Sequence, residues 1–443
     1  MLNRYLPYAQ PWLYRTATTH RFNPPTRKGL STMSAYPIGT LPPVGEVPPT
    51  MFAQVIRSNR LGEPRDAFQI EEVPTPKPKR GEVLVGVMAA GINYNNVWAA
   101  RGIPIDVIAA RQKAGEPEDF HVGGSDAAGI VYAIGEGVTS VKVGDEVAIH
   151  HGWWDADDPW VLAGKDPMIA RSSKTWGYQT NYGSFGQFTI VQDHQCLPKA
   201  PSLTWEEAAA STLCGTTAYR MMFGWQPHVT KKDDVVLVWG GSGGVGSMAI
   251  QMAKAVGAIP VAVVSNDERG EFCVQLGAKG YINRNDFTHW GTPPHWTDDA
   301  GQKAWTASAR AFGSKIWEIV GEKKDPAIVI EHPGEATVPT SIFVCEPGGM
   351  VVICAGTSGY SAVVDLRYHW TRQKRFQGSH GTNDEQAIEY NKMLTSGAIH
   401  PALGEVLAFD QIPDAHQRMH EGDLALGNTA ILIGAPTRGL GKK

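Results

Sequence analysis

Cysteine is scarce and scattered in this chain of 443 residues. There are five cysteines, and no two of them form a Cys-x-x-Cys pair. They are Cys196, Cys214, Cys273, Cys345 and Cys354. Disulfide-framed domains and Cys-rich zinc lobes both need closely spaced cysteines, so the sequence argues against both. This usage is typical of a reducing compartment, and we expect the protein to be cytoplasmic.

Long apolar runs and a strong net charge are also missing. No stretch approaches the roughly 20 apolar residues of a membrane-spanning helix. The formal net charge is −4, so we expect neither nucleic acid nor an anionic membrane as a partner. With 42% hydrophobic and 19% charged residues, the composition is that of a globular protein, and its length allows two or three domains.

Acidic residues are absent from the start of the chain, where the first is Glu46. The basic residues before it are Arg4, Arg15, Arg21, Arg27 and Lys28. An acid-free, Arg-bearing segment is typical of an organelle transit peptide. Recurring prolines and a poor amphipathic pattern favour a disordered extension, or a true start at Met33. We therefore set residues 1–35 apart from the folded domains, with organelle targeting as the alternative location.

An apolar run of strand length, Val235–Trp239, leads into a glycine-rich loop and then into a helix-favouring segment. In a dinucleotide-binding unit, the first glycine allows a tight turn, the second admits the pyrophosphate, and the third lets helix pack on strand. These roles fall on Gly241, Gly243 and Gly246. The helix N-terminus offers N–H groups and a positive dipole end to phosphate. We predict that the cofactor is bound by Gly241, Ser242, Gly243, Gly244, Val245 and Gly246.

The next strand, Ile259–Val264, indicates which dinucleotide binds. An NAD site uses a carboxylate at the strand tip for the ribose 2′-OH. Here the tip holds Ser265, and Arg269 follows one helical turn later. A hydroxyl and a guanidinium suit a 2′-phosphate, so we predict NADPH. The neighbouring Asp267 and Glu268 leave NAD as the alternative.

Patterns along the chain divide it into three folded segments. Short strands and turns dominate the first, and its clearest strands are Val83–Ala90, Gly129–Gly135 and Val143–Ile149. Strands alternate with helices in the second, which is the doubly wound pattern. The tail holds a predicted helix and a closing strand, Asp384–Thr395 and Thr429–Ile433. We place the first part of a catalytic domain at 36–202, a nucleotide-binding domain at 203–365, and a return to the catalytic domain at 366–443.

Several strings along the chain are typical of one superfamily. They are Gly91-Ile92-Asn93-Tyr94-Asn95, Gly124-Ser125-Asp126-Ala127-Ala128-Gly129, Val143-Gly144-Asp145-Glu146-Val147 and Thr204-Trp205-Glu206-Glu207-Ala208-Ala209. From Met51 to Pro436 the chain resembles the medium-chain dehydrogenase/reductase superfamily. The resemblance implies an α/β fold: a GroES-like β-barrel catalytic domain plus a Rossmann domain with a doubly wound parallel sheet.

Zinc-dependent members of that superfamily place Cys or His ligands just after the strand that is Val83–Ala90 here. This chain has Asn93-Tyr94-Asn95-Asn96-Val97-Trp98 instead. Zinc needs three or four convergent Cys, His or carboxylate ligands. The spacing of the other candidates is not diagnostic; these are His121, His150, His151 and Asp155. We therefore expect a zinc-independent enzyme without a metal site.

Longer strings resemble the crotonyl-CoA carboxylase/reductases within that zinc-independent branch. They are Trp176-Gly177-Tyr178, Gly183-Ser184-Phe185, Glu331-His332-Pro333-Gly334-Glu335-Ala336-Thr337, Gly348-Gly349-Met350-Val351-Val352-Ile353-Cys354-Ala355-Gly356-Thr357 and Gln373-Lys374-Arg375-Phe376-Gln377-Gly378-Ser379-His380. The resemblance implies that an α,β-unsaturated acyl-CoA, such as crotonyl-CoA, reacts with CO2 and NADPH to give an alkylmalonyl-CoA, such as ethylmalonyl-CoA. It also implies a homo-oligomer, either a dimer or a tetramer.

The resemblance further implies four side chains that handle CO2: an Asn, an aromatic residue, a Glu and a His. By motif these fall on Asn95, Tyr178, Gln179 and His380. Gln179 departs from the family's Glu, and a neutral amide is a weaker acceptor than a carboxylate. An enoyl-CoA or quinone-type reductase that protonates instead of carboxylating therefore stays as an alternative. A cofactor-binding protein without turnover is a third hypothesis, which the set of four side chains argues against.

Basic residues near the end of the nucleotide domain are candidates for the phosphates of CoA. They are Arg367, Lys374 and Arg375. The alternative is a solvated basic face with no ligand.

Overall fold

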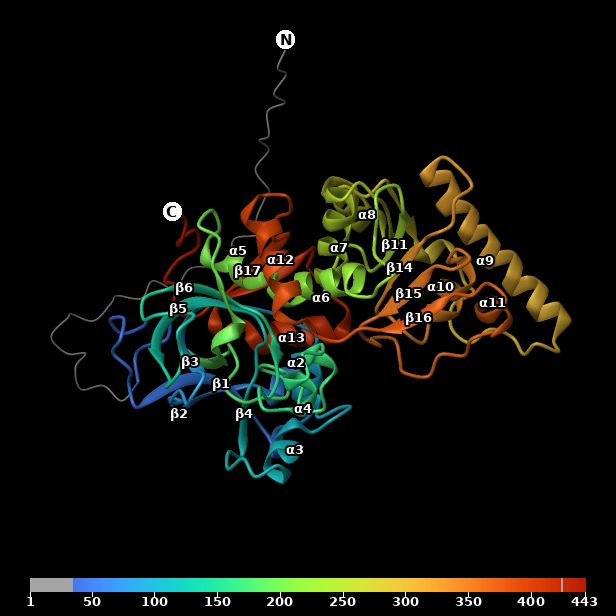
Figure 1. Ribbon diagram of the computed structural model, residues 1–443. Coiled ribbons are helices and arrows are strands. Elements are labelled where there is room, and N and C mark those ends of the chain that lie inside the picture. The colour runs from blue at the N-terminus through green and yellow to red at the C-terminus, as the bar shows by residue number, and fades with distance from the viewer. Residues whose placement is uncertain (1–34, 424) are drawn as a thin grey trace, which may run out of the picture. The chain divides into compact units, whose positions relative to one another are not determined.

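Two larger sheets of different kinds organise the chain in this computed structural model (Figure 1). The structure describes residues 35–423 and 425–443. The predicted N-terminal extension, with its alternatives of a transit peptide or a late start at Met33, lies almost entirely outside the described residues. Within the described part, no helix is both long enough and apolar enough to span a membrane.

The first large sheet is mostly antiparallel and is centred on β3 (Glu82–Gly91), which confirms the predicted strand Val83–Ala90. Its order is β10-β6-β5-β3-β18-β17, and β9 also pairs with β3. The partners are β5 (Ala127–Ile134), β6 (Glu146–Ile149), β9 (Phe188–Gln192), β10 (Cys196–Pro198), β17 (Leu403–Leu407) and β18 (Asn428–Leu432). A smaller sheet of order β2-β1-β4 is made by β1 (Thr50–Arg57), β2 (Gln69–Pro74) and β4 (Phe120–Val122).

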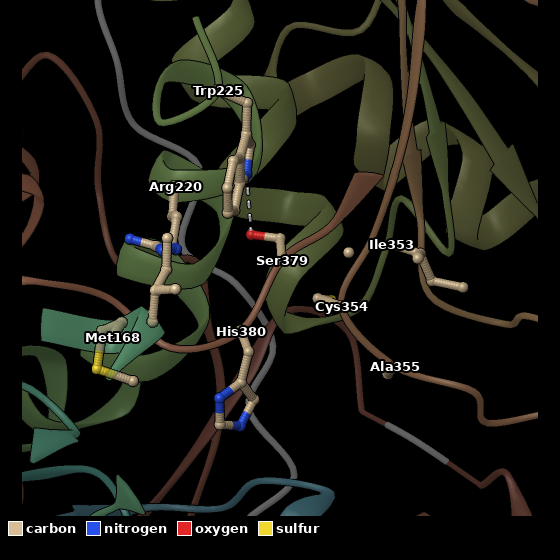
Figure 2. Close-up of a pocket in the computed structure, with 10 residues that line it drawn as sticks. Met168, Arg220, Trp225, Ile353, Cys354, Ala355, Ser379 and His380 are labelled. Atoms are coloured by element: carbon tan, nitrogen blue, oxygen red, sulfur yellow. Dashed lines mark hydrogen bonds between the residues drawn. The ribbon is translucent and has the colours of Figure 1, made fainter. Parts of the chain in front are cut away.

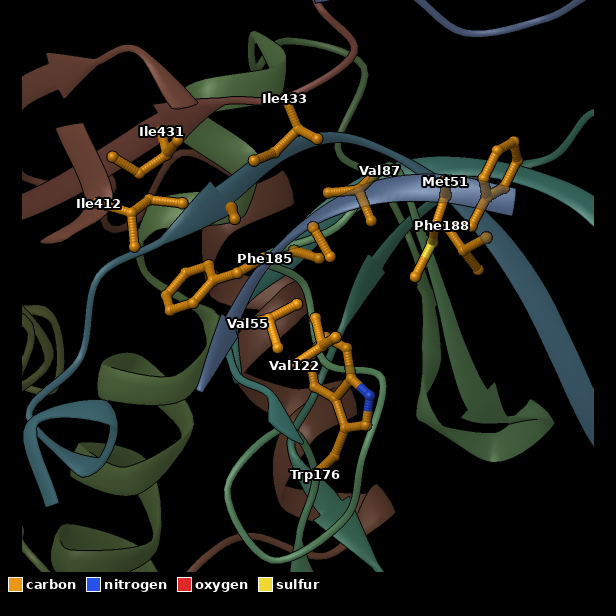
Figure 3. Close-up of a cluster of buried hydrophobic side chains, with 14 of the residues drawn as sticks. Met51, Val55, Val87, Val122, Trp176, Phe185, Phe188, Ile412, Ile431 and Ile433 are labelled. Carbon is orange, nitrogen blue, oxygen red and sulfur yellow. The ribbon is translucent and has the colours of Figure 1, made fainter. Parts of the chain in front are cut away.

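Apolar side chains from these strands meet in one core (Figure 3). Alternate residues of a strand point to the same face, so Met51 and Val55 of β1 both face inward. Phe188 of β9 and Val87 of β3 join them, and all four are fully buried. Burying such a side chain stabilises the fold by about 1.5–3 kcal/mol, so the inward-facing residues hold this unit together.

The second large sheet is parallel and has the order β13-β12-β11-β14-β15-β16. Its strands are β11 (Val235–Trp239), β12 (Ile259–Val264), β13 (Gly280–Asn283), β14 (Ile328–Glu331), β15 (Met350–Ile353) and β16 (Arg375–Gly378). The chain adds β12 and β13 on one side of β11 and then adds β14, β15 and β16 on the other side, so the order of the strands changes direction between β11 and β14. In doubly wound sheets a ligand binds in the crevice at this point, outside the carboxyl ends of the strands.

Helices cover both faces of the parallel sheet (Figure 1). On one face, buried side chains come from α6 (Thr212–Phe223), α7 (Gly244–Ala255), α8 (Asp267–Leu276) and α12 (Asp384–Thr395). On the other they come from α9 (Asp299–Val320) and α10 (Val338–Val344). Helix α9 therefore provides part of the core: Phe312 stacks on Trp239, with ring centroids 5.7 Å apart.

The boundaries of the nucleotide-binding unit differ from those predicted at residues 203 and 365. Strand β16 (Arg375–Gly378) forms the edge of the parallel sheet, so that sheet extends past residue 365. Its sequence, Arg-Phe-Gln-Gly, is too short and polar to resemble a buried strand. At the other boundary, α5 (Trp205–Ala210) packs on β3 and β5 of the first unit. The chain returns to the antiparallel sheet only at β17.

The remaining elements are short connections. They are η2 (Ser58–Arg60), α1 (Pro64–Ala67), α2 (Asn95–Arg101), α3 (Val107–Lys113), β7 (Gly152–Trp153), α4 (Pro159–Leu162), η3 (Pro167–Ile169), β8 (Lys174–Thr175), η4 (Asp193–Gln195), η5 (Arg284–Asp286), α11 (Arg367–Trp370), η6 (Phe409–Gln411) and α13 (Ile412–Glu421).

Candidate active site

The glycine-rich loop lies between β11 and the start of α7, at the crevice of the parallel sheet. Its residue with positive φ is Gly240, at +57°, so the turn depends on Gly240, one position before the Gly241 assigned from sequence. A side chain at Gly241 would put its Cβ 2.8 Å from the Cβ of Ala262. At Gly246 the Cβ would lie 2.4 Å from the carbonyl oxygen of Gly240. Close packing of α7 on β11 therefore requires Gly246.

Two further glycines lie at the start of α7, and a different contact requires glycine at each of them. Gly243 is the N-cap of α7, with an ordinary φ of −88°. A Cβ at Gly243 would lie 3.5 Å from the nearest protein atom, which is normal contact, so the protein alone does not demand glycine there. A phosphate approaching the helix N-terminus would demand it. Gly244 is hemmed in by Cys214, whose Sγ would lie 2.5 Å from an added Cβ.

Arg269 joins the tip of β12 to the glycine loop. Its Nη1 donates to the Oγ of Ser242 at 3.2 Å, and its backbone N–H donates to the side chain of Asn266, the N-cap of α8. The guanidinium therefore lies across the crevice, on the side of Ser265 where a 2′-phosphate would be. Arg269, Ser242 and the closely packed glycines of the loop therefore fit a bound dinucleotide that carries a 2′-phosphate.

Three of the four predicted CO2-handling side chains border one cavity of about 550 Å³. Tyr178 and Gln179 reach it from the turn after β8 in the first unit, and His380 reaches it from the segment after β16. The carboxyl end of β15 and the segment that follows it form the opposite wall, with Ile353, Ala355 and Tyr360. Residues some 200 positions apart in sequence are thus brought to one site.

Thr175, in β8, connects two of these side chains. Its backbone N–H donates to the Oε1 of Gln179 at 2.9 Å. Its Oγ1 lies 3.3 Å from the Nε2 of His380. The amide oxygen of Gln179 accepts this bond and keeps a second lone pair, and its NH2 group is free of this bond and can donate to a ligand. Sequence reasoning missed Thr175 because no motif marks a residue that acts through its backbone and a hydroxyl.

Burial sets the protonation of His380 and Tyr178. Desolvation, with a smaller contribution from the positive charge of Arg220, lowers the pKa of His380 below its usual value. The imidazole is therefore neutral near pH 7 and can both donate and accept. Burial also raises the pKa of Tyr178 to about 12, so its hydroxyl keeps its proton. The Tyr178 ring lies 6.4 Å from that of Trp98, centroid to centroid.

Asn95, the fourth predicted side chain, begins α2 and is not among the residues that border this cavity. Its Nδ2 donates to the Oγ of Ser125 at 2.8 Å, and its Oδ1 accepts from Asn96 at 2.8 Å. Trp98, one helical turn later on the same face of α2, does border the cavity. Asn95 therefore sits beside the wall, and its contact with CO2 stays a prediction.

Comparisons with known proteins decide the family. Residues 79–201 match the family model described as alcohol dehydrogenase GroES-like domain, and residues 244–396 match zinc-binding dehydrogenase. A crotonyl-CoA carboxylase/reductase of Cereibacter sphaeroides is 47% identical, covering 91% of this chain and 93% of its own. The chain belongs to the crotonyl-CoA carboxylase/reductase family. The predicted pairing of a GroES-like domain with a Rossmann domain is likewise confirmed.

Solved structures of the family superpose closely. Crotonyl-CoA carboxylase/reductase AntE in complex with NADP has a TM-score of 0.88 at 50% identity, covering 91% of this chain and all of its own. The 2-octenoyl-CoA carboxylase reductase CinF, from a Streptomyces species, was solved with NADP and 2-octenoyl-CoA. Its TM-score is 0.82 at 36% identity, covering 90% of this chain and 91% of its own. Both relatives therefore hold the dinucleotide that the sequence predicts here.

The basic residues predicted for CoA are mostly engaged within the protein. Lys374 is buried, and its Nζ donates to the carbonyl oxygen of Ile342 in α10 at 2.6 Å. Its assignment to CoA was therefore wrong, because the ammonium caps backbone carbonyls inside the fold. Arg375 donates to Gln377 and to the carbonyl oxygens that follow α6. Arg367 is exposed and paired with Asp365, and its role toward CoA stays a prediction.

The position of the superfamily's zinc site does not fit zinc in this chain. Asn93 stands in the segment that follows the strand Val83–Ala90, and Asp126 and Cys214 are its hydrogen-bond partners. Asn93 donates to the Oδ2 of Asp126 at 3.0 Å, and the Cys214 thiol donates to the Oδ1 of Asn93 at 3.3 Å. Burial raises the pKa of Cys214 well above its usual value, so the thiol keeps its proton. One neutral thiol and one carboxylate fall short of the three or four ligands that zinc needs.

A second cluster, His150, His194 and Asp384, has ligand atoms within 4.8 Å of one another. The N–H of Gly152 donates to the Nδ1 of His150, so the proton of His150 is on Nε2, which donates to Asp384 at 3.0 Å. His194 donates to the same carboxylate at 2.8 Å. Burial alone would raise the pKa of Asp384, but these hydrogen bonds outweigh it and hold that pKa at about 2. The cluster is thus a hydrogen-bonded clamp that fixes the start of α12.

Proposed function

We propose that this chain catalyses the NADPH-dependent reductive carboxylation of an α,β-unsaturated acyl-CoA, such as crotonyl-CoA to ethylmalonyl-CoA. The observation that carries this proposal is the convergence of Tyr178, Gln179 and His380 on one cavity at the carboxyl end of β15. Family membership supports it, since carboxylating relatives share the fold over about nine-tenths of the chain.

NADPH, when bound along the glycine loop, supplies hydride to Cβ of the enoyl thioester. Negative charge then develops on Cα and on the thioester oxygen of the substrate. Cα must meet CO2 before it meets a proton, because protonation would give simple reduction. The site therefore has to hold CO2 over Cα and exclude water. The aromatic side chains Trp98 and Tyr178 form the dry part of the wall.

Hydrogen-bond donors would hold CO2 and stabilise the carboxylate that it becomes. The NH2 group of Gln179 is directed away from its bond to Thr175, since only its oxygen takes part in that bond. The neutral imidazole of His380 can donate directly or through water. Donors placed where charge develops stabilise the transition state more than the ground state. Asn95 would add a further donor through its remaining amide proton.

Product analysis tests this proposal. The protein is incubated with NADPH, crotonyl-CoA and ¹³C-bicarbonate with carbonic anhydrase, and the acyl-CoA products are weighed by mass spectrometry. We expect labelled ethylmalonyl-CoA as the main product. Butyryl-CoA as the sole product at saturating CO2 would establish the alternative, a reductase that protonates, which the Gln179 departure favours. Absence of NADPH oxidation would leave only a binding role.

We also propose that the chain forms a homo-oligomer, a dimer or a tetramer. Within the described residues, the edge strand β16 pairs only with β15 and leaves its outer side open. Exposed apolar side chains lie near it: Leu366 is 62% exposed and Trp370 is 60% exposed. An open edge beside an apolar patch favours association. Light scattering should give at least twice the chain mass, and Trp370→Glu should lower it.

A cytoplasmic location is our proposal for the same protein. It is supported by the five cysteines, which are all free, with Cys214, Cys273 and Cys345 buried. Buried free thiols suit a reducing compartment. A fluorescent protein fused to the C-terminus should stay in the cytoplasm, whereas an organellar signal lost on deleting residues 1–34 would establish the targeting alternative.

A further inference from the structure

A second cavity, of about 400 Å³, meets the first at His380, Ile353 and Ala355. Figure 2 shows its wall: Arg220 is in α6 and Trp225 follows that helix, Met168 comes from the first unit, and Cys354 lies opposite them. Ile169 also lines it and is 53% exposed, so the cavity reaches the surface there. The imidazole of His380 stands at the junction of the two cavities.

The wall of this second cavity is apolar or internally satisfied. Arg220 is 2% exposed and pairs with Asp166 at 2.8 Å, so its charge is neutralised. The indole N–H of Trp225 donates to the Oγ of Ser379 at 3.2 Å. Burial raises the pKa of Cys354 to about 12, so its thiol is neutral. Among the described residues, the Nε atoms of Arg220 and Arg111 are the guanidinium nitrogens that are buried without a hydrogen-bond partner, and only Arg220 borders this cavity.

Such a wall discriminates among small molecules. Bicarbonate is an anion, and burying it without an unpaired cation is costly. A buried water needs two to four polar partners, whereas this wall has few that are free. Carbon dioxide is neutral and has no dipole, so it enters an apolar passage readily. It can still accept a hydrogen bond from the neutral imidazole of His380, which borders both cavities.

The first cavity cannot serve the same purpose during turnover. Under the proposed function, the enoyl thioester lies in the cavity bordered by Trp98, Tyr178 and Gln179. Once the acyl-CoA and the cofactor are in place, that opening is filled by their own atoms. Carbon dioxide must nevertheless arrive at Cα beside His380, so it needs an approach from another side.

We propose that the second cavity is the passage through which CO2 reaches the active site, from Ile169 at the surface past Met168, Trp225 and Arg220 to His380. This inference rests on the proposed carboxylation, because a reductase has no use for a CO2 passage. It assigns Arg220 and Trp225 to CO2 delivery, a role separate from binding the acyl-CoA.

Two substitutions narrow the passage from different elements. Gly378 borders the cavity, and a Cβ there would have no protein atom within 4 Å, so Gly378→Leu fills open space. Ile169→Trp narrows the surface end. The matched control is Ile105→Trp, because Ile105 borders only the first of the two cavities and is 46% exposed. Each variant is assayed as the full chain, with carbonic anhydrase present and CO2, crotonyl-CoA and NADPH varied in turn.

We expect Gly378→Leu and Ile169→Trp each to raise the KM for CO2 at least fivefold. Their KM for crotonyl-CoA and their kcat at saturating CO2 should stay within twofold of wild type, while butyryl-CoA increases at low CO2. Ile105→Trp should leave the KM for CO2 unchanged and raise that for the acyl-CoA. An unchanged KM for CO2 in both passage variants, or an equal rise in the control, would overturn the passage but not the carboxylation.

Product analysis of the wild-type protein tests the proposed carboxylation separately. If butyryl-CoA is the only product, both the carboxylation and the passage are overturned. A measurement on wild-type crystals covers the case in which a variant fails to fold. Under xenon pressure, apolar cavities take up the gas. Xenon density between Met168, Trp225 and Ala355 is expected, and its absence at a pressure that loads other cavities would overturn the passage.

Discussion

The glycine loop and the candidate CO2 site differ in how the chain builds them. The loop and Arg269, the arginine predicted to bind the 2′-phosphate, lie within residues 240–269, which run from the loop through α7 and β12 to the start of α8. The candidate CO2 site draws on Asn95, Thr175, Gln179 and His380, which come from α2, from β8 and the turn after it, and from the segment after β16. In the loop the backbone itself makes the site, because Gly246 leaves no room for a side chain. In the CO2 site a few side-chain hydrogen bonds set the geometry.

This difference decides how each region tolerates change. A site made by the backbone depends on close packing, so only residues small enough for the available space can occupy its positions. A site made of side-chain donors can exchange one donor for another if the atoms still reach. Gln179 in place of the family's Glu is such an exchange, since its oxygen keeps the bond to the N–H of Thr175. The contrast can be tested from either side.

The largest effect is expected on the cofactor side, from Arg269→Ala. This change removes a charge-assisted contact with the 2′-phosphate, worth about 1.5–3 kcal/mol. The KM for NADPH should rise on the order of 10- to 100-fold, while that for NADH barely changes. The neighbouring Glu268→Ala is the control and should leave NADPH binding intact. Equal efficiency of the wild type with NADH and NADPH would contradict the assignment.

A smaller effect is expected from removing one donor at the CO2 site. Asn95→Leu or His380→Ala loses about 1–2 kcal/mol of hydrogen bonding to CO2, so the ratio of carboxylated to protonated product should fall roughly five- to thirtyfold. NADPH oxidation should fall less. Mass analysis of the products at fixed CO2 measures this. Unchanged partitioning in both variants would mean that these residues do not contact CO2.

Restoring the family's carboxylate should have a modest effect. Gln179→Glu keeps the acceptor for Thr175 and exchanges the NH2 donor for a second oxygen that can accept from His380 or a water. These two changes oppose each other, so the net effect should be no more than about two- to fivefold, or roughly 0.5–1 kcal/mol. If the amide weakens CO2 binding, the carboxylated share at low CO2 should rise by that factor. If the wild type already carboxylates nearly every turnover, no gain will be measured, and Gln179 is a tolerated exchange.

The smallest effect is expected from removing metal. Asn93 makes hydrogen bonds with Asp126 and with Cys214, and these three side chains do not form a set of zinc ligands. Activity should therefore survive exhaustive dialysis against a chelator within experimental error. Elemental analysis before and after dialysis provides the control. Stoichiometric zinc whose loss abolishes activity would contradict this.

The fold was largely predictable from local patterns. The helix Asp384–Thr395 was predicted with the bounds that the structure shows, because its capping residues and apolar spacing are strong signals. The edge strand Arg375–Gly378 was missed, because four mixed residues carry no periodicity. The boundary at residue 365 was wrong for the same reason.

The site was predictable only as far as motifs reach. Tyr178, Gln179 and His380 were identified by family resemblance, since nothing in their spacing shows that β8 and β16 end beside each other. Thr175 was missed because its part depends on that meeting. Lys374 was misassigned because a sequence does not show that an ammonium is buried under the end of α10. Proximity and burial arise from tertiary packing, and local reasoning cannot supply them.

The clamp at Asp384 has a mechanical consequence. His380 stands on the short stretch of chain between β16, a strand of the parallel sheet, and Asp384, which His150 and His194 hold to the antiparallel unit. This segment is fixed at one end to the parallel sheet and at the other end to the antiparallel unit. Any rotation of one body against the other must carry the imidazole with it or pull on the clamp. A change in the angle between the two halves of the enzyme would therefore move His380, the histidine that is predicted to handle CO2.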